Sequence, residues 1–221
     1  LAWFSVLGRE LSQAPPPALS GPVTEAPRLV VSGWKNAYHP ALNGRPLRLE
    51  PDEQSRSLAI APDGAGFALG TERRLRRFDR DGRRLRETPV PGAAWAVNIA
   101  RKEPLVVAAL GDGTIRWYAW ETGAELLALF AHRDGRRWVA WTPSGYYDAS
   151  IDGDRLVGWH LSRGSGKAPS FHAAGQFRAL YHAPKVVAEI LDLLDEDEAV
   201  RSGLKKARRE LDASVLPPLL E

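Results

Sequence analysis

The sequence predicts a mainly β protein in which four-stranded antiparallel units repeat and a small α-helical extension follows. Three observations lead to this prediction. Short β-like runs between glycine-containing turns recur at steps of 40 and 41 residues within residues 28–164. Tryptophan disappears from residues 170–213, and apolar residues there take a helical spacing. The 221 residues are 44% hydrophobic and 26% charged, which is typical of a globular chain with a real core.

The first segment, residues 1–27, is expected to lie outside the repeats. Apolar residues alternate along residues 1–7, which favours a strand, with a short helix as the alternative. Residues 14–27 contain five prolines. Because proline has no amide donor and fixes its own φ, this stretch is predicted to be an extended linker.

The repeats have aromatic residues in register. When residues 58–82, 97–123 and 139–164 are superposed, Phe78, Tyr118 and Trp159 share one position. Four short strands about every 40 residues are the signature of a β-propeller blade. Residues 28–164 supply about three and a half blades, whereas a ring closes with roughly four to eight.

This shortage predicts a partner, because an open set of blades leaves unpaired strand edges. The missing blades are expected from a separate chain, from an N-terminal part of a longer product, or from a second copy. The absence of an initiator methionine, with Leu1 first, agrees either with a start that was processed off or with a piece of a longer chain.

The repeats resemble WD repeats. The run Asp112 to Arg116 is similar to the stretch that opens the third strand of such a blade, and Phe78-Asp79 stands where the Trp-Asp pair would be. Trp159-His160 keeps only the tryptophan, and Tyr118-Ala119 keeps neither residue. The expected fold is therefore a partial WD-like β-propeller.

The resemblance also implies a structural cluster in the last repeat. His132 precedes Trp159 by 27 residues, where the family often has a histidine. With Ser150 and either Asp152 or Asp154, it is expected to form the inter-strand hydrogen bonds of the family. These residues are predicted to be structural, since a buried histidine needs hydrogen-bond partners.

A more specific resemblance lies at the end of the repeats. Residues 136–164 and 171–191 look like a junction in large bacterial caspase-like proteins, in which a WD-repeat propeller joins a short helical segment. A caspase-type peptidase domain follows in those proteins. The resemblance implies an association with such a peptidase.

The extension, residues 165–221, is predicted to be helical. A helix is expected over residues 174–181, and a second one starts at Pro184, where proline is tolerated in the first turn. Residues 195–212 are acidic first and basic later, which suits the dipole of a third helix. This helix is expected to be solvated, with docking of another subunit or domain as the alternative.

Arginines concentrate in residues 72–87, on one predicted blade. They alternate with apolar residues at strand spacing, which places them along its outer edge. Contacts with an acidic partner or a nucleic acid would use six of them: Arg73, Arg74, Arg76, Arg77, Arg83 and Arg84. The alternative is a solvated outer strand.

Composition excludes several chemistries. The chain has no cysteine, so it cannot hold a disulfide, a cysteine-ligated metal or a cysteine nucleophile. The five histidines show no paired metal spacing, and no cofactor is expected. The longest apolar run, residues 1–8, is too short to cross a bilayer and lacks the basic flank of a signal peptide, so no membrane contact is predicted and the cytoplasm is favoured.

Together these observations predict a non-catalytic interaction or regulatory module associated with a caspase-like protease. One alternative is a proteolytic fragment that remains bound to a catalytic half. Another is a module that binds an acidic partner or nucleic acid through its arginine-rich blade, which the net charge of +3 permits without requiring it.

Overall fold

The computed structural model describes residues 3–6, 8–12, 20–161, 168 and 170–214. The chain divides into two compact units, which we describe separately. The sheet unit comprises Pro17–Ala128, and the helix unit comprises Leu1–Pro16 with Leu129–Glu221. These boundaries differ from those expected after residues 27 and 164.

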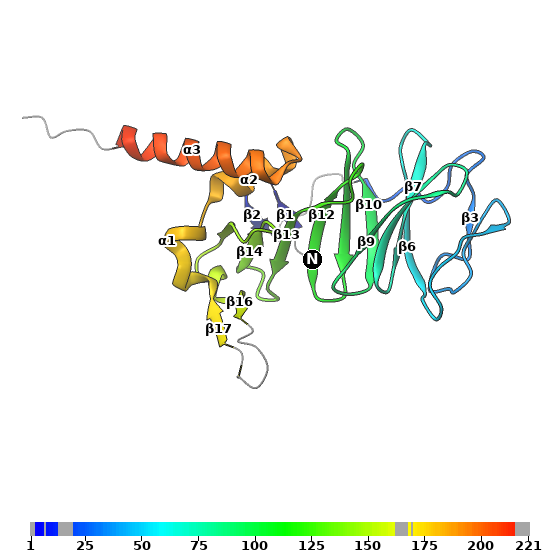
Figure 1. Cartoon of the computed structure of the whole chain (residues 1–221), viewed down its shortest axis with the longest axis horizontal. Coiled ribbons are helices and arrows are strands. Elements are labelled where there is room, and N and C mark those ends of the chain that lie inside the picture. Colours follow the sequence, from blue (N-terminus) through cyan, green and yellow to red (C-terminus); the bar gives the residue numbers. More distant parts are fainter. Residues whose placement is uncertain (1–2, 7, 13–19, 162–167, 169, 215–221) are drawn as a thin grey trace, which may run out of the picture. The chain divides into compact units, whose positions relative to one another are not determined.

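The predicted fold class is confirmed at a coarse level, because the described part of the structure is mainly β (41% strand, 18% helix) and three helices lie at its C-terminal end. The sheet unit contains three antiparallel sheets (Figure 1). The first has three short strands: β3 (Val31–Ser32), β4 (Ala41–Leu42) and β5 (Arg45–Pro46).

Each of the other two sheets contains a meander of four strands, in which each strand pairs with the next one along the chain. One consists of β6 (Ser55–Ile60), β7 (Gly66–Thr71), β8 (Arg74–Asp79) and β9 (Arg84–Pro89). The other consists of β10 (Ala94–Ile99), β11 (Leu105–Leu110), β12 (Thr114–Ala119) and β13 (Glu125–Ala131), within which the chain passes into the helix unit.

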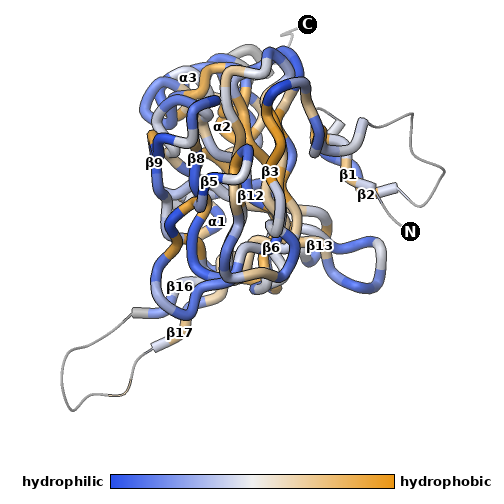
Figure 2. The backbone as a smooth tube through the Cα atoms, turned by 90° about the vertical axis from the view of Figure 1, so that its right-hand side faces the viewer, coloured by the Kyte–Doolittle hydropathy of each residue, from blue (hydrophilic) through white to orange (hydrophobic). Residues whose placement is uncertain are grey.

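Strands β6 and β7 are buried on both faces of their sheet. Successive side chains of a strand point to opposite sides, so the two faces are covered by different sets of residues. Large residues, including Leu58 and Phe67, pack on one side in a cluster with residues of β3 and β4. Small residues, including Ala59 and Ala68, pack on the other side against residues of β10 and β11. Successive sheets therefore stack face to face, with the polar strand β9 at an edge (Figure 2).

The repeat spacing is reproduced in these two meanders. Phe78 lies in the third strand of one and Tyr118 in the third strand of the other, and both are buried. Phe78 stacks on Phe67, the residue directly opposite on β7, with ring centroids 5.0 Å apart. The described residues form no closed ring of sheets, so the number of blades stays a prediction.

The third repeat departs from the pattern in the helix unit. Strand β14 (Trp138–Trp141) pairs with β15 (Tyr147–Ala149), and a 3₁₀ turn, η1 (Gly153–Arg155), follows. Strand β16 (Gly158–Leu161) then pairs with β17 (Ser170–Ala173), which lies beyond the expected end of the repeats. The expectation that Trp159 lies in the third strand of a further blade, at the position of Phe78 and Tyr118, is therefore not met among the described residues, because its strand pairs with β17 in a separate two-stranded sheet.

The N-terminal segment forms a short hairpin, β1 (Trp3–Ser5) with β2 (Glu10–Ser12), so residues 3–5 adopt the strand alternative. Phe4 of this hairpin packs edge-on against Trp138 with ring centroids 4.9 Å apart. Most of the predicted linker, residues 13–19, lies outside the described residues.

The helical prediction is confirmed for residues 174–214 (Figure 1). A 3₁₀ turn, η2 (Ala174–Phe177), leads into α1 (Arg178–Tyr181), followed by α2 (Pro184–Leu193) and α3 (Glu196–Ser214). Val186, Val187 and Ile190 of α2 are buried. Asp195 caps α3 by accepting the Glu198 amide at 2.8 Å. None of the described helices has the length and apolarity needed to cross a membrane.

Candidate functional site

Most of the arginines predicted to contact a partner form their contacts within the sheet unit instead. Of the six predicted residues, Arg74, Arg76 and Arg84 all form ion pairs with Glu87 of β9. Arg77 lies over the Trp120 ring, 4.3 Å from its centroid, and binds both carboxylate oxygens of Glu121 at 2.7 and 3.0 Å.

Arg76 is the centre of this network and is fully buried. Its Nη2 donates to Glu53 Oε2 at 2.7 Å and its Nε to Glu87 Oε2 at 2.8 Å, and Nη1 reaches Thr71 Oγ1 at 3.3 Å. Burial opposes ionisation of Glu53, but hydrogen bonds from Arg76 and Thr71 outweigh it and lower the pKa of this carboxyl. Arg76 was expected either to contact a partner or to be solvated. Both expectations are wrong, because its side chain is buried and its partners lie inside the fold.

The next meander repeats the arrangement 40 residues later. Arg116 of β12 binds both carboxylate oxygens of Glu125 on β13 at 2.9 Å, and Asp112 at 3.1 Å. Its Nε donates to Thr114 Oγ1 at 3.0 Å. The sequence reasoning missed this network, although an arginine on the third strand and a glutamate on the fourth recur in both repeats.

Arg73 and Arg83, the other two predicted residues, are exposed, and no side-chain hydrogen bond or ion pair of theirs is found among the described residues. The structure thus divides the six arginines into four that form ion pairs within the sheet unit and two for which no ion pair is found among the described residues. A surface formed by all six does not exist.

The predicted structural cluster is not brought together by hydrogen bonds among the described residues. Nδ1 of His132 lies 3.0 Å from Asp134 Oδ2 and 3.2 Å from Arg137 Nη2, within its own turn. Ser150 Oγ accepts the Trp138 amide at 2.9 Å, and Asp154 accepts Arg178 Nη1 at 3.0 Å. The fourth member, Trp159, lines a pocket instead.

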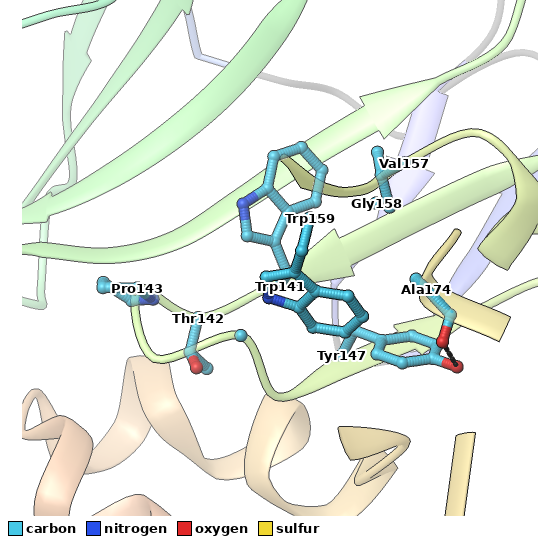
Figure 3. Close-up of a pocket in the computed structure, with 9 residues that line it drawn as sticks. Trp141, Thr142, Pro143, Tyr147, Val157, Gly158, Trp159 and Ala174 are labelled. Atoms are coloured by element: carbon cyan, nitrogen blue, oxygen red, sulfur yellow. Dashed lines mark hydrogen bonds between the residues drawn. The ribbon is translucent and has the colours of Figure 1, made fainter. Parts of the chain in front are cut away.

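This pocket, of about 370 Å³, lies in the helix unit and is the candidate functional site (Figure 3). Its volume falls within the roughly 300–1,000 Å³ of ligand pockets. The wall comes from β14, β15, β16, the turn between β14 and β15, and η2. Its principal residues are Trp141, Thr142, Pro143, Tyr147, Trp159 and Ala174.

Trp159 is held in place by other aromatic rings. Its indole packs against the Phe177 ring in a T-shape, with centroids 5.3 Å apart and planes at 88°, and it tilts against Tyr181 at 5.0 Å. Gly145 also lies against the indole, because a Cβ at that position would be 3.3 Å from its ring atoms. The φ of 93° at Gly145 further disfavours any side chain there.

The floor of the pocket is fixed by hydrogen bonds. The hydroxyl of Tyr147, which is buried, donates to the Ala174 carbonyl oxygen at 3.3 Å. Burial raises the pKa of Tyr147, and the charge of Asp154 adds to this effect. The turn above is tied to α3, since Ser144 donates from its amide and hydroxyl to Glu196 Oε1 at 2.8 and 2.6 Å.

Chemically, the pocket can hold an apolar or aromatic group. None of the described residues that line it has a charged side chain, and the hydroxyls of Thr142 and Tyr147 already have partners within the unit. Across the described ranges, no cluster of three or more histidine or carboxylate side chains is placed to hold a metal ion. Sequence reasoning assigned Trp159 to a structural cluster and did not find the pocket, because Trp141 and Trp159 belong to different sheets.

Comparison with protein-family models and with curated protein sequences finds no significant match to the chain.

Proposed function

We propose that this chain is a non-catalytic interaction module that binds an extended, proline- or aliphatic-containing segment of a partner protein in the aromatic pocket. The observation that carries this proposal is the pair Trp141 and Trp159 in a neutral pocket. The Trp159 ring is held there by its packing against neighbouring aromatic rings. Proline-rich segments dock in aromatic-lined grooves because their extended backbone loses little entropy on binding.

The experiment follows the indole N–H signals of the full chain by NMR. The probe is an acetylated Pro-Pro-Leu-Pro peptide amide, with a Gly-Ser-Gly-Ser peptide as the ligand control. We expect the signals of Trp141 and Trp159 to shift with the first peptide only. In Trp159→Ala the remaining pocket signal, that of Trp141, should no longer shift. In Trp95→Ala, which changes a residue 56% exposed in the sheet unit, the Trp141 signal should shift as in the native chain. Equal shifts in both variants would contradict the proposal.

We further infer that the partner is a caspase-like peptidase, which rests on the resemblance of residues 136–164 and 171–191. An active-site-directed cysteine-peptidase probe identifies such a partner on the isolated complex. We expect labelled peptidase to co-purify with the native chain and with Trp95→Ala but not with Trp159→Ala. A complex that contains no labelled chain would count against this assignment.

We also propose that the two stacked meanders are consecutive blades of a propeller that another chain or a second copy completes. Their face-to-face packing through the alanine-rich side of β6–β9 supports this arrangement. Light scattering of the purified chain is expected to give an oligomer. A stable monomer would argue against a propeller completed by a second copy.

A further inference from the structure

A second candidate site lies in the sheet unit, separate from the aromatic pocket. It is a groove of about 500 Å³ formed by the segment before β3 and by three turns of the meanders. Its walls include the apolar residues Val23, Pro27 and Pro62, and its charged residues are Asp63, Arg80 and Arg101. Two cations and one carboxylate give this groove a net charge of +1.

Arg80 and Arg101 differ from the arginines on the strands. Arg56, Arg76 and Arg116 each pair with a carboxylate of their own unit. Arg80 and Arg101 are exposed, and among the described residues neither side chain has a hydrogen bond or ion pair. Their guanidinium groups therefore remain available to an anionic group that enters the groove.

The backbone around both cations is held by hydrogen bonds. Asp79 Oδ1 accepts the amides of Asp81 at 3.0 Å and Arg83 at 2.8 Å, and the Arg80 amide donates to the Ala65 carbonyl at 3.0 Å. In the neighbouring meander, the Ala100 amide donates to Leu105 O at 3.0 Å and closes the turn that contains Arg101.

The apolar wall is fixed in the same way, because the Ile60 amide of β6 donates to the Val23 carbonyl at 2.7 Å. Asp63 is turned toward its own backbone, since Oδ1 accepts the Ala65 amide at 2.9 Å. The groove thus combines fixed turns, an apolar wall and two cations that have no partner in the described part of the chain. Pre-organised groups of this kind reduce the entropy lost on binding.

We propose that this groove binds an acidic peptide segment of a partner protein, in which carboxylates alternate with aliphatic residues. The carboxylates would meet Arg80 and Arg101, and the aliphatic side chains would cover Val23 and Pro62. Neither Arg80 nor Arg101 is among the six arginines that the sequence predicted to contact a partner. This site goes beyond the aromatic pocket, which lies in the other unit.

The test uses the full chain and a fluorescein-labelled Glu-Val-Glu-Val-Glu-Val peptide, followed by fluorescence anisotropy at about 50 mM salt, where charge screening is weak. Arg80→Gln with Arg101→Gln should raise the Kd at least about tenfold, because both charge-assisted contacts are lost. The matched control, Arg73→Gln with Arg83→Gln, removes the same charge outside the groove and should change the Kd less than about twofold. All four arginines are exposed, so the variants should melt like the native chain.

Three results would overturn the proposal. Equal weakening in both double variants would show attraction by net charge alone. Equal binding of a Gln-Val-Gln-Val-Gln-Val peptide would show that the carboxylates are not read. Tighter binding of a labelled oligothymidine that depends on Arg80 and Arg101 would assign the groove to nucleic acid. None of these readouts depends on the aromatic pocket.

Discussion

Replacing Arg76 by methionine tests the buried ion network of the sheet unit. The variant removes the only cation paired with Glu53 among the described residues, and the Glu53 side chain is fully buried. Its carboxylate would keep the hydroxyl of Thr71 and the Glu50 amide at 3.3 Å. Breaking a buried ion pair on one side costs about 3–5 kcal/mol. With a urea m-value of about 2 kcal/mol per M, the unfolding midpoint should fall by roughly 2 M.

The double variant, Arg76→Met with Glu53→Met, should recover most of this loss. Both buried charges are then gone, and apolar replacements of a buried pair are often neutral or stabilising. Glu87 does not become an orphan, because Arg74 at 3.0 Å and Arg84 at 2.7 Å still pair with it. The matched control is Arg84→Met, which breaks a pair whose arginine is 47% exposed and should cost less than about 1 kcal/mol.

Urea denaturation of the full chain, followed by circular dichroism and by hydrogen exchange in residues 55–89, measures these differences. The pH dependence gives a second readout. Native Glu53 has a lowered pKa, so its contribution is complete above the ordinary value of 4.5 and is lost as the pH falls through the folded pKa. In Arg76→Met, burial without a cation should raise that pKa, and the deficit should shrink on acidification. A single-variant loss below about 1 kcal/mol, or no recovery in the double variant, would refute the reasoning.

Three further predictions concern single residues. The hydroxyl of Tyr118 is buried without a hydrogen-bond partner among the described residues, so Tyr118→Phe should raise the free energy of unfolding by about 1 kcal/mol; a urea curve showing destabilisation would contradict this. Gly145→Ala should cost about 1–2 kcal/mol, because φ is 93° and the new Cβ meets Trp159, and the indole signal of Trp159 should move; an unchanged signal would count against the pocket geometry. Burial and Arg178 lower the pKa of His182, so stability should be full above 6.5 and fall as the pH drops toward the folded pKa. His182→Gln should flatten that part of a thermal pH profile, and an unchanged slope would assign it to other groups.

The two meanders of the sheet unit and the helical extension were predicted well, because the regular spacing of apolar residues and turns along the sequence indicates both. Phe78 and Tyr118 keep one position in successive third strands, and Pro184 marks the start of α2. Trp159 has the same spacing but a different strand partner. A Cβ on Gly158 would lie 2.3 Å from the His172 carbonyl oxygen, so only glycine allows β17 to approach β16 so closely. A glycine at this position is equally compatible with a turn of a propeller blade, and β17, the partner of β16, follows only at residue 170.

The arginines show where spacing stops being informative. Arg76 and Arg77 are adjacent and chemically identical, yet one is fully buried between carboxylates and the other lies over Trp120. The difference depends on Glu87 directly opposite Arg76 on β9, and on Glu53, which precedes Arg76 by 23 residues. Composition alone cannot report such pairing, because every arginine in residues 72–87 raises the same count of positive charge.

The repeat period gives some of the information on pairing that composition does not. Arg76 and Arg116 are 40 residues apart, and each faces a glutamate on the following strand, so a charge that recurs with the blade period is expected to stabilise the sheet. Arg80 and Arg101 have no such counterpart: they lie in turns of different type, after β8 and after β10. An arginine that does not recur with the blade period is not needed to pair with a carboxylate within the sheet. It is therefore the better candidate for contact with another molecule.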